Sequence, residues 1–259
     1  MTDSRTRRVL AAMLLLVGVV VAACGNDSAG TATTTTTSAA LTTLPASTTI
    51  PRTTTSEATT TTPAVERHGL LEAIEGGLVE AEFRSSGGAS GDVIDLVIRR
   101  LGDFGDVTLA LTVPTGFMLS NPAAGEQDLI VVGLEGRMIG SSTYEPVNEI
   151  ELPNDDQRTY LLEAYCAEAH DANPSEGSAL TPGDLVDPDM AAVLGALDEA
   201  GATGDLYVIQ AVIWALTDDV STGDLESVGY GLDEAGLALA QDVIEAAGLD
   251  PADFRLFAG

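Results

Sequence analysis

The hydrophobic pattern of the chain changes at Cys166, and this change constrains the fold more than any other feature. Before Cys166, residues 107–113 and 149–152 alternate apolar with small or polar side chains, as strands with one solvent-facing side do. Similar short segments, separated by Gly- and Pro-containing breakers, predict further strands at residues 78–83, 92–98, 128–132 and 158–166. Because no helical segment separates them, we expect an immunoglobulin-like antiparallel β-sandwich over residues 66–168.

After Cys166 the apolar residues recur at spacings of three and four, which is typical of helices. Asp187-Pro188 indicates a helix start, and that helix should end near Gly201. A second helix, expected from about residue 205 to 217, is apolar nearly all round and should be buried. Another helix is predicted at about 233–247 and one more turn at 250–251, whereas 173–175 and 181–183 have loop composition. We therefore predict an α+β fold whose residues 169–259 form a small subdomain of three to four helices.

Residues 1–23 have the organisation of an export signal, with arginines followed by an apolar run at residues 9–23. The small residues before Cys24 resemble the lipobox of bacterial lipoproteins, in which the cysteine becomes the lipidated first residue of the mature protein. This resemblance implies a palmitate-type lipid anchor on Cys24 and a place on the extracytoplasmic face of the cell membrane. A plain secretion signal with an incidental cysteine is the alternative.

Residues 24–65 are dominated by threonine, with Ser, Ala and Pro between, and predict a disordered linker. Such a linker would space a folded head from the membrane, and its composition is also typical of O-glycosylated stalks.

The formal net charge of the chain is −29, and the chain contains arginine but no lysine. So acidic a protein repels phosphate, which makes nucleic acid and anionic lipid poor partners.

Cys166 and Gln210 are the residues that most strongly suggest a site. The chain has two cysteines, so lipidation of Cys24 would leave Cys166 unpaired in an oxidising compartment. Strand alternation places Cys166 on the same inward face as Tyr160. Gln210 is an amide within an apolar helix, where an unpaired amide costs about 1–3 kcal/mol. We therefore expect Gln210 to have a partner, either through a hydrogen bond or through a covalent bond.

Two short motifs around these residues resemble the thioester domains of bacterial surface adhesins. Tyr165-Cys166 matches the aromatic-Cys motif, and residues 209–214, Ile-Gln-Ala-Val-Ile-Trp, match the helix motif apolar-Gln-x-x-apolar-Trp. The resemblance implies an internal thioester between the Cys166 sulfur and the Gln210 acyl carbon, with Tyr165 and Trp214 as supporting residues. It also implies attack on that bond by an amine of a surface or matrix protein. The spacing from Cys to Gln is shorter than in that family, and Ala167 stands where a larger apolar residue is usual.

The predicted function is therefore that of a lipid-anchored binding or adhesion protein of the cell envelope. The alternatives are a non-covalent structural or interaction module, in which Cys166 and Gln210 are core residues, and an envelope hydrolase. Beyond a single acyl transfer to an amine, no enzymatic activity is expected. Cys166, His170 and Asp171 lack a fourth metal ligand, and the sequence has no glycine-rich phosphate loop or zinc motif, so we predict no metal and no cofactor.

Overall fold

The structure is a computed structural model that describes residues 64–258 of the 259-residue chain. The predicted signal at residues 1–23, the predicted lipidation site Cys24 and the linker up to residue 63 lie outside the described residues. The last two residues of the predicted linker, Ala64 and Val65, belong to a strand, so the folded part begins slightly earlier than expected.

The described chain consists mainly of strands up to residue 185 and of helices after it, which confirms the α+β class. The strands are β1 (Ala64–Gly69), β2 (Val79–Ser85), β3 (Ser90–Arg100), β4 (Val107–Thr112), β5 (Phe117–Ser120), β6 (Leu129–Met138), β7 (Tyr144–Pro146), β8 (Ile150–Leu152), β9 (Arg158–Cys166) and β10 (Ala179–Leu185). The helices are α1 (Leu70–Glu75), α2 (Pro188–Ala200), α3 (Leu206–Thr217), α4 (Thr222–Ser227) and α5 (Glu234–Ala246), followed by short 3-10 turns at Pro251–Asp253 and Arg255–Phe257.

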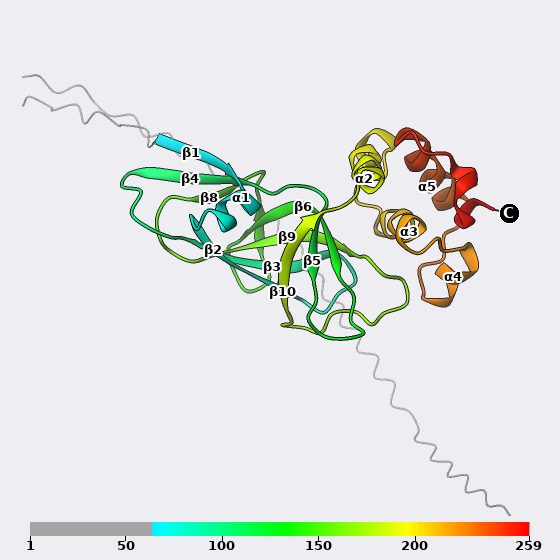
Figure 1. Ribbon diagram of the computed structural model, residues 1–259, viewed down its shortest axis with the longest axis horizontal. Coiled ribbons are helices and arrows are strands. Elements are labelled where there is room, and N and C mark those ends of the chain that lie inside the picture. Colours follow the sequence, from blue (N-terminus) through cyan, green and yellow to red (C-terminus); the bar gives the residue numbers. More distant parts are fainter. Residues whose placement is uncertain (1–63, 259) are drawn as a thin grey trace, which may run out of the picture. The chain divides into compact units, whose positions relative to one another are not determined.

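Most of the strands belong to a closed antiparallel ring (Figure 1). Its order is β5-β10-β2-β3-β9-β6, and pairing of β6 with β5 closes it, while β7 adds to the edge of β6. Within the ring β9 lies between β3 and β6, so that Ser90 is opposite Tyr165 and Leu129 is opposite Cys166. This closed pairing is barrel-like and differs from the two open sheets of an immunoglobulin-like sandwich.

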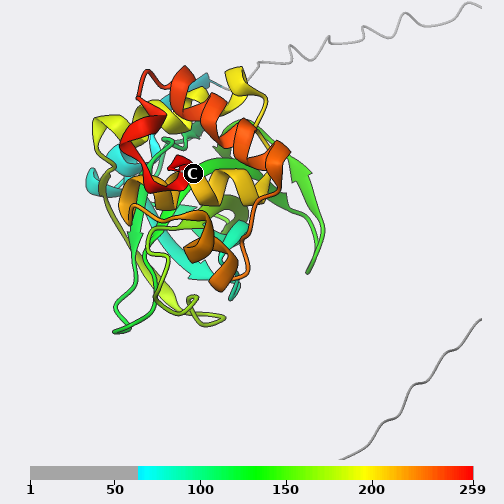
Figure 2. The same ribbon diagram turned by 90° about the vertical axis from the view of Figure 1, so that its right-hand side faces the viewer.

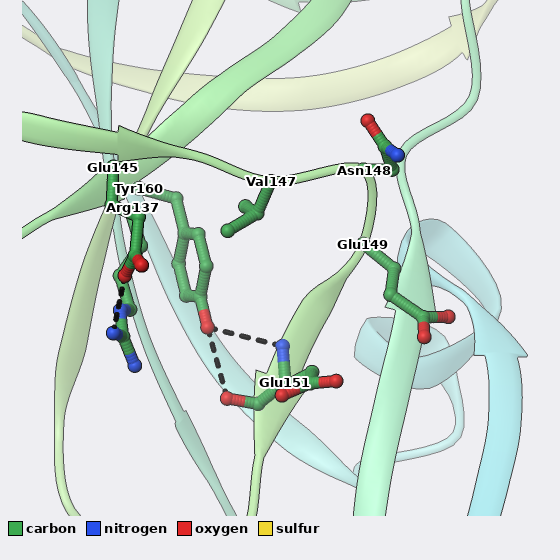
Figure 3. Close-up of a pocket in the computed structure, with 7 residues that line it drawn as sticks. All are labelled: Arg137, Glu145, Val147, Asn148, Glu149, Glu151 and Tyr160. Carbon is green, nitrogen blue, oxygen red and sulfur yellow. Dashed lines mark hydrogen bonds and ion pairs between the residues drawn. The ribbon is translucent and has the colours of Figure 1, made fainter.

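A second, three-stranded sheet is formed by β1, β4 and β8, with β1 parallel to β4 and β8 antiparallel to it. The side chain of Tyr160 connects this sheet to the barrel, because it extends from β9 to β8 (Figure 3). Its hydroxyl donates to Glu151 O at 2.9 Å and accepts from Glu151 N at 3.1 Å. These bonds satisfy a buried tyrosine hydroxyl, which would otherwise be costly to bury.

Helices α2 to α5 gather at one end of the barrel, and in Figure 2 they lie in front of the strands. The helix predicted at 205–217 is confirmed as α3, and all its residues from Val208 to Ala215 are buried. The N-caps of α2, α3 and α5 are Asp187, Asp205 and Asp233, and the side chain of each accepts a backbone hydrogen bond from the first turn. The end of β9 packs against α3, which places the predicted site between the barrel and the helices.

One local prediction is wrong, and one helix lies where no element was predicted. Residues 181–183 were expected in a loop but lie in β10, which belongs to the barrel although it falls within the range predicted to be helical. Pro182 is tolerated there because β10 pairs with β2 only at Ala179 and Leu180, after which it pairs with β5 through an irregular register. Helix α4 was not predicted, although Ser221 and Asp224 form a capping box at its start.

Candidate functional site

The last residue of β9 and the middle of α3 meet at Cys166 and Gln210. Both side chains are fully buried, with 0% exposure. Cys166 ends the predicted inward-facing row of β9, and that row is confirmed because Tyr160, Leu162 and Ala164 are also buried. The structure therefore brings together the two residues that the sequence suggested as a pair.

The side-chain amide of Gln210 pairs with the backbone of Cys166 in both directions. Its Nε2 donates to Cys166 O at 2.8 Å, and its Oε1 accepts from the Cys166 N–H at 3.2 Å. This N–H is shared, because it also donates to Ala89 O at 3.0 Å. The two backbone groups determine which end of the amide is the oxygen. They also hold the amide of Gln210 beside the residue that bears the thiol.

Two further residues, Ser90 and Tyr230, complete the polar network around the amide. Ser90 Oγ donates to Gln210 Oε1 at 2.6 Å and lies 3.0 Å from the Tyr230 hydroxyl oxygen. A serine hydroxyl has one hydrogen, which here is donated to Gln210, so the Tyr230 hydroxyl is the donor toward Ser90. Ser90 begins β3, and Tyr230 lies between α4 and α5. Neither was predicted, since only the pairing of β3 with β9 and the position of the later loop bring them here.

Tyr230 is held by an aromatic cluster that includes Trp214. The ring of Tyr230 lies 5.0 Å from that of Trp214 in an edge-to-face arrangement and 5.5 Å from that of Tyr207, measured between centroids. Trp214 is buried, and its Nε1–H has no hydrogen-bond partner among residues 64–258. The motif tryptophan therefore contacts the site through Tyr230, one helical turn after Gln210.

The other motif residue, Tyr165, is buried within the barrel wall. Its hydroxyl donates to Glu163 Oε1 at 2.6 Å, and burial together with this carboxylate raises the pKa of the phenol. Tyr165 thus contributes to the site through strand pairing, because its partner across the ladder is Ser90.

The Cys166 thiol is free and neutral. Within residues 64–258, Cys166 forms no disulfide bond. Burial, with a smaller effect of the nearby Glu168 carboxylate, raises its pKa to about 12. At neutral pH the sulfur therefore keeps its proton, which protects it from oxidation and means that any attack on the amide must release that proton.

The structure also has cavities outside this network. The one in Figure 3, of about 450 Å³, is lined by Arg137, Glu145, Val147, Asn148, Glu149, Glu151 and Tyr160. Arg137 pairs with Glu145 at 2.7 Å, and the Tyr160 hydroxyl donates to the backbone of β8. These polar groups of the cavity therefore already have partners within the protein. A second cavity, of about 340 Å³, adjoins the end of β9 at Ala167 and Glu168 and reaches Thr217 on α3.

The remaining sequence candidates are not joined to this network. His170 and Asp171 lie in the exposed bend after β9, where Asp171 O accepts from Gln127 Nε2 at 2.6 Å. Between residues 64 and 258, no three His, Cys, Asp or Glu side chains are grouped as metal ligands. Within the same range, none of the helices has the length and apolar character needed to cross a bilayer.

Comparisons with protein-family models, with curated proteins and with solved structures found no match.

Proposed function

We propose that this protein is a lipid-anchored binding or adhesion module of a bacterial cell envelope, and that it binds covalently through a Cys166–Gln210 thioester. The observation that supports this most directly is the two-way hydrogen bonding between the Gln210 amide and the Cys166 backbone. A glutamine held in this way has its acyl carbon beside a residue with a free thiol, shielded from water. Exclusion of water protects a thioester from hydrolysis.

The proposed bond-forming step is an acyl transfer from nitrogen to sulfur. The Cys166 sulfur attacks Gln210 Cδ, so that a carbon–sulfur bond forms and the bond from Cδ to Nε2 breaks. The thiol proton leaves with the nitrogen, and the products are the thioester and ammonia. When a primary amine of a partner later attacks Cδ, an amide bond forms, the carbon–sulfur bond breaks and a proton returns to the sulfur.

The partner in this proposal is a protein with an accessible primary amine, of which the lysine side chain is the commonest. A cavity that begins at Ala167, the residue after Cys166, is lined by the carboxylates of Glu168, Asp187 and Asp218. These acidic groups favour the approach of an alkylammonium ion. The chain itself has no lysine that could react with its own thioester.

The cellular setting belongs to the same proposal. The export signal at residues 1–23 and the lipid on Cys24 would attach the chain to the extracytoplasmic face of the cell membrane, and residues 24–65 would act as the spacer. An immunoglobulin-like sandwich is also proposed for the strand-rich part: the ring would then be a sandwich whose sheets are joined at both edges.

A second candidate function is favoured by the same hydrogen bonds. Gln210 has its amide oxygen and nitrogen satisfied without any covalent bond, as a buried core amide requires. In that case the residue connects α3 to the barrel, and the protein is a non-covalent structural or interaction module.

Reaction of the full chain with an amine probe distinguishes the two. Incubation with biotin-cadaverine should attach one probe to residue 210 and release one titratable thiol at Cys166, as peptide mass spectrometry and thiol titration would measure. The Cys166→Ala variant, which keeps the backbone hydrogen bonds, should take up no probe. Absence of probe from the wild-type protein, or equal labelling of the variant, would favour the non-covalent module.

A further inference from the structure

We infer that Ser90 is a catalytic hydrogen-bond donor to the Gln210 carbonyl, stabilising the oxyanion that forms when the thioester is made or opened, and that Tyr230 positions and polarises it. This inference rests on the proposed thioester. It starts from the contact of Ser90 Oγ with Gln210 Oε1, which at 2.6 Å is the shortest hydrogen bond in the network.

The reaction places negative charge on the atom that Ser90 contacts. As the sulfur or an amine adds to Gln210 Cδ, the carbonyl double bond opens and its electron pair moves to Oε1. When the intermediate collapses, the pair returns and either the nitrogen or the sulfur leaves. Donors held near this oxygen before the reaction lower the barrier, because the charge develops in a site with little water. Gln210 is 0% exposed, so water does not supply this stabilisation.

Two donors meet at Oε1, and they are not equivalent. The Cys166 N–H is longer, at 3.2 Å, and is shared with Ala89 O. The Ser90 hydroxyl has its single hydrogen directed at Oε1, so it should be the stronger donor in the transition state.

Tyr230 acts through Ser90 and is a positioning residue. Its hydroxyl donates to Ser90 Oγ at 3.0 Å, and a chain of hydrogen bonds polarises each member. The rings of Trp214 and Tyr207 pack against Tyr230 and hold this donor in place. The motif tryptophan thereby acquires a role in the chemistry without contacting the reacting atoms.

The position of Ser90 depends on the backbone of the following glycine. Gly91 has φ +87°, a conformation that side chains rarely adopt, and a Cβ there would lie 3.0 Å from Leu206 Cδ2 at the start of α3. The close approach of β3 to α3 therefore requires glycine after Ser90. This approach brings the hydroxyl within reach of Gln210.

The test is the rate at which methylamine opens the thioester in the full chain, followed by intact mass. Ser90→Ala should slow this reaction by about 10²–10³-fold, the usual effect of losing one oxyanion donor. Ser90→Thr, which keeps a hydroxyl, should restore most of the rate, and Tyr230→Phe should slow it several-fold. Ser85→Ala, at a buried serine of β2, is the control for loss of a barrel serine hydroxyl and should leave the rate unchanged.

The outcomes are separable. A wild-type protein without the thioester overturns the proposed function and this inference with it. A wild-type thioester that Ser90→Ala opens at the same rate overturns the inference alone. If Ser90→Ala folds, as judged by its melting temperature, but never forms the thioester, the inference is supported. If Ser90→Ala does not fold, Tyr230→Phe provides the test. A slower opening of the thioester by methylamine in Tyr230→Phe supports the inference, and an unchanged rate contradicts it.

Discussion

Replacing Cys166 by alanine is a sensitive probe of the proposed bond, because it removes the sulfur and leaves the hydrogen bonds in place. Gln210 binds the N–H and C=O groups of residue 166, and alanine keeps both. Without a thioester, the variant loses only the packing of a small buried side chain, which we expect to cost about 1 kcal/mol in the free energy of unfolding.

With a thioester, the same substitution also removes a cross-link. Residues 166 and 210 are 44 positions apart. A bond across a loop of this length lowers the entropy of the unfolded chain and should raise the free energy of unfolding by about 4 kcal/mol. The total loss should then be about 5 kcal/mol. For a folded region of this size, the cross-link alone corresponds to a decrease in Tm of about 8–16 °C.

A double-mutant cycle separates the two contributions. Denaturant unfolding would be measured for the wild-type protein, Cys166→Ala, Gln210→Ala and the double variant. In the Gln210→Ala background no bond can form, so adding Cys166→Ala should cost only about 1 kcal/mol. The coupling between the two sites should therefore be about 4 kcal/mol. A coupling below about 1 kcal/mol would refute the cross-link and leave Gln210 as a hydrogen-bonded core residue.

Three other predictions follow from particular contacts. Tyr160→Phe should lower the free energy of unfolding by about 1–3 kcal/mol in denaturant titrations, because both hydrogen bonds to the β8 backbone are lost. An unchanged free energy of unfolding would mean that these bonds do not hold the three-stranded sheet to the barrel. Gly91→Ala should lower the melting temperature more than Gly125→Ala. Both glycines have positive φ, but only at Gly91 would a Cβ lie against a neighbouring side chain, that of Leu206. Equal melting temperatures would contradict the close approach of β3 to α3. Burial raises the pKa of the Cys166 thiol to about 12, whereas the unfolded thiol ionises near pH 9. In the Gln210→Ala variant, where the thiol cannot be acylated, the free energy of unfolding should therefore fall by up to about 1.4 kcal/mol per pH unit as pH rises above 9. Adding Cys166→Ala should remove that part of the pH dependence, and an identical pH profile in both proteins would show that the thiol is not buried.

Local patterns in the sequence were sufficient to predict several elements. The strand expected at residues 158–166 is β9 with the same bounds, because its alternation reflects one inward face. The helix expected at about 205–217 is α3, since a helix that is apolar all round has to be buried. The partner expected for Gln210 is found for a similar reason, because a buried amide must be satisfied.

The barrel closure could not be predicted, because it depends on contacts between distant segments. β10 pairs with β2 and β5, and no local pattern specifies which strands lie at either side. The proline of β10 also suggested a loop, since the sequence alone does not reveal that one side of the strand is unpaired at that position.

The polar network around Gln210 could not be predicted either, because it also depends on contacts between distant segments. Ser90 lies 120 positions from Gln210 and 140 from Tyr230 in the sequence, so only folding brings these residues together. An ordinary serine at the start of a strand and a tyrosine in a loop carry no signal of their own. The resemblance to thioester domains suggested Cys166 and Gln210 as a pair, and the structure adds the residues that surround the Gln210 carbonyl.

Intact mass spectrometry of the full chain tests the central claim most directly. Processing of the N-terminus affects the wild-type protein and the Cys166→Ala variant equally, so their mass difference reports on residue 166. Cysteine is heavier than alanine by about 32 Da, and formation of the thioester releases ammonia, about 17 Da. The wild-type protein should therefore exceed the variant by about 15 Da. A difference of about 32 Da, with a thiol at Cys166 that can be titrated after unfolding, would contradict the thioester.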